Sequence, residues 1–336
     1  MDQATVGTDT IERILHRYEP YLHDCRRYIG GRLRRDPAAA VLVRYFEKGK
    51  MLRALLVFMA ASATGSEPSK MLMVGAALEL LHGASLIHDD IVDEADTRRG
   101  MPALHVQVGI GPALVLGDYL ILRSFAVLRE AETVYEPYAV LGALHTLNHY
   151  AQACCLGEVY ELLPSGQSDP EAHYLSVVKG KSAAPFIAAA TLPAILAMGT
   201  LGEIEALRAY GLNLGIAFQI QDDVLDLIGD ASILGKPVGL SFVKGRPMLP
   251  LIYLEREGSP PARREYRRLQ QLEEGRAELV RLLTAEGIWE RVSTTRDKYV
   301  SAAQHALDRL SPSEGTDALR VFASYATTHS NLSHNH

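Results

Sequence analysis

Residues 86–100 read LIHDDIVDEADTRRG and place five carboxylates within eight positions, directly before two arginines. The preceding run, AALELLHGASLI at 76–87, is apolar and has the spacing of a buried helix. Residues four apart share a helix face, so Asp89 and Asp93 point the same way, with Asp90 beside them. In isolation, such a cluster is equally typical of a solvated helix end. Here the apolar residues before it indicate that the acids border a buried space.

A second acidic cluster strengthens that interpretation. Residues 218–226 read FQIQDDVLD, again inside an apolar helical segment, with Asp222 and Asp226 four apart and Asp223 adjacent. Unpaired carboxylates in apolar surroundings are costly, and cations would neutralise them. The ligands are all oxygens, without Cys or His, which favours Mg²⁺ over zinc. Because protein Mg²⁺ sites are commonly completed by substrate phosphates, two facing clusters predict a diphosphate bound through several ions.

The composition of the whole chain excludes several other classes of protein. The chain has 336 residues, is 48% hydrophobic and carries a formal net charge of −6, which argues against nucleic-acid binding. Its three cysteines, Cys25, Cys154 and Cys155, have neither zinc-site nor disulfide-framework spacing. We find no secretory signal, no lipidation motif and no apolar run long enough to span a membrane. We therefore predict a cytoplasmic protein without a stable membrane anchor.

Helical periodicity recurs along nearly the whole chain. Apolar residues are spaced three and four apart, Ala and Leu dominate, and no convincing run of alternating strand residues occurs. Breakers such as TGSEPS, LPSGQSDP and GSPP fall between the helical segments, and no long linker divides them. We predict one all-α domain over residues 1–330, with about ten or more helices, and a polar tail at 331–336.

The motifs, taken together and in order, resemble those of the trans-isoprenyl diphosphate synthases, also called polyprenyl synthetases. They are KGKMLRA, HGASLIHDD with IVDEADTRRG, GKS, FQIQDDVLD, and GKPVG with KGRPMLP. The resemblance covers roughly residues 45–255. It implies the isoprenoid synthase fold around a deep central cavity, usually in a homodimer. It also implies that an allylic diphosphate is ionised and that isopentenyl diphosphate attacks the cation, giving a longer all-trans product.

The resemblance assigns residues to the allylic substrate and its metal ions. About three Mg²⁺ ions would be bound directly by Asp89, Asp93 and Asp222. Supporting hydrogen bonds and water contacts would come from Asp90, Asp223 and Asp226. The leaving diphosphate would be bound by Arg98, Lys181 and Lys236. The rest of the allylic substrate would contact Ser182, Phe218 and Gln219.

A second pocket, for the diphosphate of isopentenyl diphosphate, follows from the same resemblance. Its residues would be Gly49, Lys50, Arg53, His82 and Arg99. Each residue also has an ordinary explanation when taken alone. Lys50 and Arg53 share a helix face and could be surface charges, and His82 follows two leucines and could be a core histidine. The joint pattern, rather than any single residue, favours the pocket.

Product length should depend on the helix before Asp89, because the hydrocarbon tail grows along it. One helical turn is about 5.4 Å, close to one isoprene unit. The residues one turn before Asp89 are Ala84 and Ser85, both small. Members of the family that stop at fifteen carbons carry aromatic residues here, so we expect a product of C20 or longer. The channel floor is expected at Leu80, Leu81 or near Tyr119.

The chain departs from the family pattern at several positions, and three other interpretations stay open. Met51 is at a family arginine position, and Ala54 is at a proline position. Leu240 and Ser241 are at acidic positions. Arg246 is at a lysine position, and Glu158, which follows Gly157, is at a glutamine position. A class I terpene cyclase shares the fold and the first motif, but normally carries a different second metal motif. A non-catalytic partner subunit usually loses aspartates or arginines, whereas this chain keeps both clusters. An all-α scaffold with acidic faces is the remaining alternative.

Overall fold

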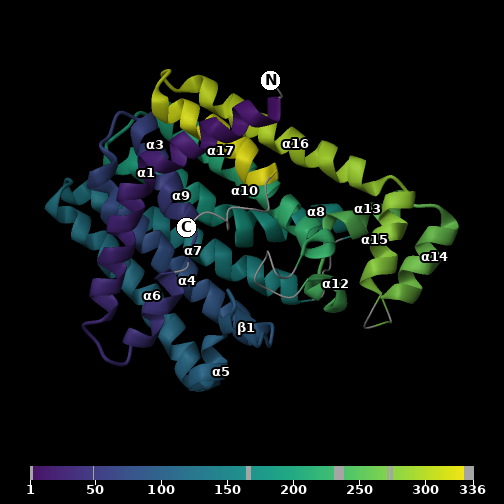
Figure 1. Ribbon diagram of the computed structural model, residues 1–336. Coiled ribbons are helices and arrows are strands. Elements are labelled where there is room, and N and C mark those ends of the chain that lie inside the picture. The colour runs from purple at the N-terminus through teal and green to yellow at the C-terminus, as the bar shows by residue number, and fades with distance from the viewer. Residues whose placement is uncertain are drawn as a thin grey trace.

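The computed structural model describes residues 3–47, 49–163, 168–230, 238–270, 272 and 275–328. Within these ranges the protein is built almost entirely of helices, as the sequence predicts (Figure 1). The α-helices are α1 (Gln3–Leu33), α2 (Val43–Glu47), α3 (Leu52–Ala63), α4 (Leu72–Val92), α5 (Leu104–Val108), α6 (Ile110–Arg129), α7 (Pro137–Leu162), α8 (Pro170–Val178), α9 (Ala184–Leu196), α10 (Leu201–Ile228), α12 (Leu240–Val243), α13 (Leu249–Glu257), α14 (Pro260–Leu269), α15 (Arg276–Ala285), α16 (Ile288–Ala306) and α17 (Glu314–Thr328).

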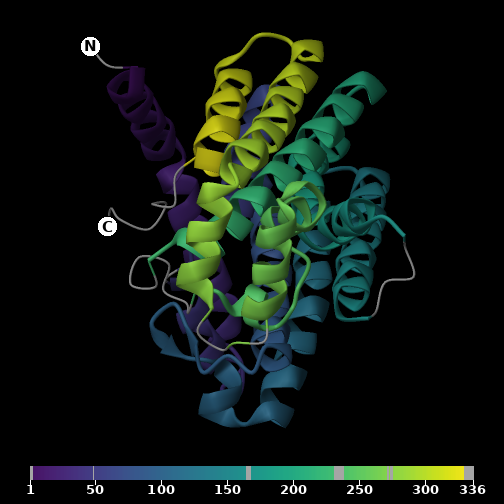
Figure 2. The ribbon, with the colours of Figure 1, turned by 90° about the vertical axis from the view of Figure 1, so that its right-hand side faces the viewer.

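Short elements complete the chain between these helices. They are the 3₁₀ segments η1 (Ala40–Leu42), η2 (Pro68–Met71), η3 (Glu130–Thr133) and η5 (Leu307–Arg309), the π-helical segment η4 (Lys179–Ala183), and strands β1 (Thr97–Arg98) and β2 (Met101–Pro102). Figures 1 and 2 place the small β1–β2 hairpin and α5 at one end of the molecule, with α16 and α17 at the other. The lysine–serine pair at 181–182, which could have been an ordinary helix start, lies instead in the π-helical segment.

Long helices α4 and α10 carry the two acidic clusters through the centre of the fold. The α4 helix packs chiefly against α6, and α10 packs against α9 and α16. A capping box starts α10, because the Thr200 hydroxyl accepts from Glu203 N at 3.2 Å and the Glu203 carboxylate accepts from Thr200 N at 2.7 Å. The helix then runs unbroken to Ile228, so its second-cluster carboxylates stay on a rigid element.

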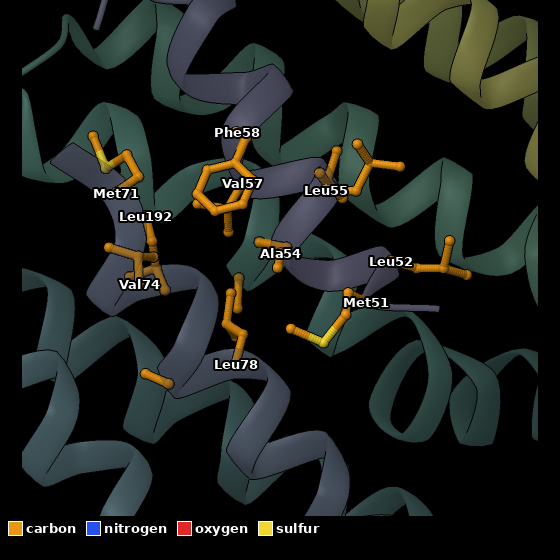
Figure 3. Packing of buried hydrophobic residues seen from close by; sticks show 14 of the residues in the cluster. Met51, Leu52, Ala54, Leu55, Val57, Phe58, Met71, Val74, Leu78 and Leu192 are labelled. Atoms are coloured by element: carbon orange, nitrogen blue, oxygen red, sulfur yellow. The ribbon is translucent and has the colours of Figure 1, made fainter. Parts of the chain in front are cut away.

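Helix α3 forms the densest part of the hydrophobic core, against α4 and α9 (Figure 3). Figure 3 shows Phe58 and Val57 of α3 near Val74 and Leu78 of α4. Nearly every α3 side chain is buried. Since full burial of one such apolar side chain contributes about 1.5–3 kcal/mol, this packing fixes where α3 begins relative to α4. The first turn of α3 contains Arg53, which the sequence predicts for a second diphosphate pocket, so the core positions this residue.

Two sets of buried apolar residues make up the core, and α10 contributes to both. The first half of the helix supplies Leu207 and Tyr210 to the larger set, and the second half supplies Ile216 and Ile220 to the set around α13–α16. This shared helix supports the prediction of one domain over residues 1–330, which stays a prediction. The polar tail at 331–336 lies outside the described residues.

Close approaches of small residues position η4 between α7 and α10. A Cβ at Gly157 of α7 would lie 2.3 Å from Lys181 N, and one at Gly180 would lie 2.8 Å from Ala153 O. On the other side, a Cβ at Gly215 of α10 would lie 2.4 Å from Ala183 Cα. Only glycine permits these backbone contacts, which bring the π-helical turn within reach of both acidic clusters.

Gly157→Ala is therefore expected to destabilise the fold by about 1–3 kcal/mol, because the new methyl group meets backbone rather than a movable side chain. The melting temperature should fall accordingly. Gly31→Ala is the matched control, since this exposed α1 position has no atom within 4 Å of the added Cβ. The control should gain about 0.5–1 kcal/mol of stability. Equal melting temperatures for both variants would contradict the close α7–η4 contact.

The expectation that no apolar run is long enough to span a membrane is wrong, because two of the described helices are long and apolar enough by length and composition alone. One, Pro68–Val92, has 61% of its most apolar window buried and is a core helix. The other, Ile110–Thr133, has 28% buried and exposes an apolar face, whose use is considered below. The absence of a stable membrane anchor and the cytoplasmic location remain predictions.

Candidate active site

The two acidic clusters border one cavity of about 2300 Å³, at the centre of the helices. Most of the sequence-predicted site residues line this cavity: Gly49, Lys50, Arg53, Leu81, His82, Ala84, Ser85, Asp89, Asp93, Arg98, Arg99, Lys181, Ser182, Phe218, Gln219, Asp222, Asp223 and Asp226. Asp90 does not line it, and Lys236 lies outside the described residues. The deep central cavity expected from the sequence is thus confirmed.

At the end of α4, Asp89 faces the cavity and Asp93 is the first residue beyond the helix. The Asp93 N–H still donates to Asp89 O at 2.7 Å, which keeps the two residues in helical register. Burial raises the pKa of Asp89 to about 6, with a smaller contribution from the nearby Glu158 carboxylate, although Lys181 opposes the shift. The Asp93 carboxylate pairs with Arg246 and lies 3.6 Å from Lys244 Nζ.

Asp90 points away from the cavity and is fully buried. Its Oδ1 accepts from Arg98 Nε at 2.7 Å, and Arg98 adds a second contact through Nη2. Arg98 lies a few residues after α4, in strand β1 of the hairpin, where it pairs with Met101 of strand β2. The left-handed backbone at Gly100, with φ of 71°, lies in the turn between the two strands. The carboxylate therefore anchors the arginine, which itself borders the cavity.

Lys181 is held between two carboxylates of α7 that the sequence analysis did not assign. Its Nζ lies 2.6 Å from Glu161 Oε2 and pairs also with Glu158. Arg246 joins the same network by donating from Nη1 to Glu161 Oε2 at 3.2 Å. These carboxylates, together with Asp89, raise the pKa of Lys181 despite its burial. The family departures at positions 158 and 246 thus belong to one network around this lysine, since Glu158 pairs with Lys181 and Arg246 pairs with its other partner, Glu161.

The second cluster is organised by hydrogen bonds around Asp223. Gln219 Nε2 donates to its Oδ1 at 2.8 Å, and Tyr174 Oη donates to its Oδ2 at 2.7 Å. Ser182 Oγ in turn donates to Gln219 Oε1 at 2.6 Å, which fixes the amide orientation. Burial raises the pKa of Asp223 to about 7, against these hydrogen bonds. Tyr174 carries no motif and could not have been identified from the sequence.

Asp226 holds the chain segment that follows the second cluster. Its Oδ1 accepts from Gly239 N and its Oδ2 from Ser241 N, both at 3.2 Å. The departure at Ser241 therefore uses its backbone rather than its side chain at this point. Asp222 lines the cavity, as Asp223 and Asp226 do.

The donor set fits Mg²⁺ that is bound together with a phosphorylated substrate. In the described part of the chain, no three His, Cys, Asp or Glu side chains form a metal cage by themselves. Mg²⁺ retains water and substrate oxygens in most protein sites, so a complete cage is not required. The buried carboxylate of Asp89, with its pKa near 6, is a group whose charged form a cation would stabilise.

The raised pKa of Asp89 predicts how pH affects the metal-free protein. A carboxyl whose pKa rises from 3.8 to about 6 on folding stabilises the fold below about pH 4, and this contribution disappears as pH rises through 6. Without Mg²⁺, Asp89→Asn should therefore become more stable than the parent protein above pH 6, by up to about 3 kcal/mol. The two proteins should melt together near pH 4. Melting curves in chelator across this range test the prediction, and a constant difference would contradict it.

The residues predicted for a second diphosphate pocket lie where α3 begins, beside α4. Arg53 Nη1 is 3.1 Å from His82 Nε2, and its guanidinium lies 5.2 Å from the Phe186 ring centre. Burial and the surrounding arginines lower the pKa of His82, so this side chain is neutral. Buried Glu79 accepts from the backbone N–H groups of Arg53 and Ala54, both at 3.0 Å. It thereby caps α3.

Glu79 is a further site residue that was not predicted from the sequence. The available signal was a single acid inside the apolar run AALELL. An unpaired charge there would be costly, which is itself an indication of a buried polar partner. Arg99 completes the pocket by donating from Nη1 to Tyr45 O at 2.5 Å.

The apolar part of the cavity continues from Asp89 past small side chains. Ala84 is 1% exposed, and it borders the cavity together with Ser85 and, one turn further, Leu81. Leu80 and Tyr119 do not line it, so they do not form the floor; Ile121 of α6 lines it instead. Further apolar lining comes from Leu55, Leu78, Leu147 and Ala188.

Comparison with protein families agrees with this geometry. A family model described as polyprenyl synthetase matches residues 37–285. The chain belongs to the polyprenyl synthetase family. It is therefore a transferase with the all-α isoprenoid synthase fold. The resemblance recognised from the motifs is confirmed.

Individual members of the family agree over most of the chain. The short chain isoprenyl diphosphate synthase of Methanothermobacter thermautotrophicus is 35% identical over 83% of this chain and 85% of its own. The octaprenyl diphosphate synthase of Haemophilus influenzae is 36% identical over 63% of this chain and 62% of its own. A polyprenyl synthase structure from Caulobacter crescentus, complexed with calcium and isoprenyl diphosphate, superposes with a TM-score of 0.86 at 30% identity, covering 95% of this chain and 98% of its own.

Proposed function

We propose that this prenyltransferase condenses isopentenyl diphosphate head-to-tail with an allylic diphosphate, in a Mg²⁺-dependent reaction, and releases an all-trans product of C20 or longer. The observation that supports this most directly is one cavity bordered both by the two acidic clusters and by the cations Lys50, Arg53 and Arg99. A cyclase acting on one substrate has no need of these additional cations. The coarser activity, transfer of a prenyl group, follows from the family.

The difficult step is departure of the allylic diphosphate, since it separates charge. When bound between Asp89, Asp93 and Asp222, Mg²⁺ would neutralise the leaving group. Lys181 and Arg98 lie at the same end of the cavity and would add positive charge to it. Lys181 and Arg246 currently pair with Glu158, Glu161 and Asp93, so they would exchange these carboxylates for phosphate oxygens. Lys236 is proposed for the same role from its motif alone.

The cation left behind would lie against aromatic and amide groups. The ring centres of Phe218 and Phe186 are 5.1 Å apart, and both rings border the cavity. An aromatic face stabilises a nearby cation, and the apolar wall keeps water from it. The second substrate's diphosphate would be held by the second diphosphate pocket, with Lys50, Arg53 and Arg99 as cations. The departed diphosphate is a suitable base for the final proton, so no catalytic histidine is invoked.

Product identity tests this proposal directly. The protein is incubated with labelled isopentenyl diphosphate, Mg²⁺ and each allylic starter in turn, and products are identified by mass. Linear diphosphates of C20 or longer support the proposal. Products that stop at farnesyl diphosphate would overturn the chain length alone. Hydrocarbons or alcohols formed from the starter alone would indicate a cyclase, and no turnover with any starter would indicate a partner-dependent subunit.

We also propose that the protein is a homodimer through the outer face of α6 and α7. Large apolar side chains on this face are more than half exposed: Ile110, Val115, Leu122, Tyr138 and Leu141. Exposed apolar surface of this kind typically marks a protein or membrane contact. Asp118, with 60% of its side chain exposed, lies in the middle of α6. A charge there is costly in lipid, which favours a second copy over a membrane.

The double variant Leu122→Glu with Leu141→Glu is expected to be monomeric, since it places carboxylates at the most exposed leucines of this face. Light scattering after size-exclusion chromatography measures the molar mass. Leu272→Glu, at an exposed leucine of a different surface, is the control and should leave the dimer intact. A monomeric parent protein, or a double variant that stays dimeric, would rule out this interface.

A further inference from the structure

One cation at the second diphosphate pocket has no counterpart in the motifs. Arg26 of α1 lines the cavity, and its side chain is 28% exposed. Its Nη2 donates to Gly49 O at 3.4 Å, and its Nη1 donates to Glu19 Oε1 at 3.0 Å. Within the described residues its buried Nε has no hydrogen-bond partner. Because a guanidinium has five N–H donors, Arg26 retains donors for an anion.

Arg26 and Arg99 both approach Gly49. A Cβ added at Gly49 would lie 3.1 Å from Arg99 Nη1, so Arg99 approaches this glycine through its side-chain space. Arg26 donates a hydrogen bond to the carbonyl oxygen of the same glycine. Two guanidinium groups therefore converge on Gly49, directly before Lys50. A larger residue at this position would press against the end of the Arg99 side chain, which would have to shift by a few tenths of an ångström.

The charges already present in the pocket show why a further cation would strengthen the binding of a diphosphate. Buried Glu79 interacts electrostatically with Arg53 and Arg99 and offsets part of their charge. Met51, at a family arginine position, is 2% exposed and has its side chain in the core (Figure 3). The aspartates expected to hold metal ions, Asp89, Asp93 and Asp222, are assigned to the allylic substrate. The diphosphate in this pocket would therefore be neutralised chiefly by the cationic side chains around it.

We propose that Arg26 is a substrate-binding residue for the diphosphate of the second, non-allylic substrate, and that it replaces charge lost at Met51. Its contact with Gly49 O also fixes the peptide before Lys50. The residue lies outside the 37–285 region that the family model matches. This inference rests on the proposed function, because it assumes that the pocket binds isopentenyl diphosphate.

Kinetics that separate the two substrates test the role of Arg26. For Arg26→Gln, the KM for isopentenyl diphosphate should rise roughly tenfold or more, since a hydrogen bond to a charged group is lost. The KM for the allylic starter and kcat should change by no more than about twofold, because neither depends on this pocket's ground-state contacts. Arg26→Lys keeps the charge and should recover most of the loss. Arg27→Gln is the matched control, since this neighbour is 74% exposed and pairs with Asp24.

Calorimetric binding of isopentenyl diphosphate without metal provides a readout that does not need turnover. Weaker binding by Arg26→Gln but not by Arg27→Gln supports the inference. Equal binding by both variants, or equal increases in both KM values, overturns it. If Arg26→Gln does not fold, Glu19→Gln takes its place. This variant removes the carboxylate that pairs with Arg26, so binding of isopentenyl diphosphate should not weaken. Weaker binding overturns the inference. A parent protein that binds this substrate but does not elongate it refutes the proposed function instead.

Discussion

Asp89→Asn is expected to lower kcat/KM for prenyl transfer by roughly 100- to 1,000-fold or more, which is the typical loss when one electrostatic contact to a leaving group is removed. Asparagine has the same shape as aspartate but lacks the negative charge that would hold a cation against the diphosphate. The carboxylate borders the cavity, and burial already raises its pKa to about 6. Steady-state rates at saturating Mg²⁺ measure the effect.

Asp96→Asn is the control for this loss, because it makes the same change of charge only seven residues further along the chain. Asp96 is exposed and does not line the cavity, so its variant should retain nearly full activity. The metal-free Asp89→Asn protein should at the same time be more stable above pH 6, as argued from its pKa. A fall in activity together with a gain in stability is typical of residues kept for function. Full activity in Asp89→Asn would refute the metal role but leave the family assignment intact.

The acidic clusters could be predicted from the sequence because helical spacing alone determines their geometry. Asp89 and Asp93, or Asp222 and Asp226, are four apart, and four residues return a helix to the same face. The all-α fold follows for the same reason, since the period of the apolar residues is visible in nearly every segment. The different roles of the aspartates within one cluster were harder to predict from the sequence. Asp90 is adjacent to Asp89 in sequence, yet it is fully buried and anchors Arg98.

Contacts between distant segments could not be predicted, because no local pattern encodes them. Lys181 was identified as a phosphate ligand, but its partners Glu158 and Glu161 come from α7, and Arg246 comes from beyond α10. The π-helical turn that carries Lys181 also has no signature of its own. It depends on the backbone contact with Gly157. In the sequence, Gly157 was notable only because Glu158, at a family glutamine position, follows it.

Arg26 shows a further limit of motif-based reasoning. Family motifs identify positions that many members share, whereas Arg26 is on α1, before the matched region. It becomes a candidate only when the fold brings α1 against the loop that contains Gly49. The departure at Met51 gave a reason to look for a replacement cation but not its location.

The length of the product should respond most strongly to Ala84. This residue is 1% exposed and borders the cavity one turn before Asp89, where the growing tail must pass. Ala84→Phe would put an aromatic ring across the channel, so the product should shorten, with C15 or smaller chains dominating. Ala84→Val should give an intermediate distribution. Product masses after complete consumption of the starter measure the change, and an unchanged distribution would contradict the proposed path of the tail.

Leu81 and Leu80 form a matched pair that separates a channel effect from a loss of packing. Both are leucines of α4, but Leu81 lines the cavity whereas Leu80, 2% exposed, packs in the core without lining it. Leu81→Ala opens space ahead of the tail, so the product should lengthen by at least one isoprene unit if Leu81 forms part of the floor. Leu80→Ala should cost about 2–5 kcal/mol of stability and leave the product unchanged. Longer products from Leu80→Ala would show that general loosening of the helix, rather than the residues along the cavity wall, determines where elongation stops.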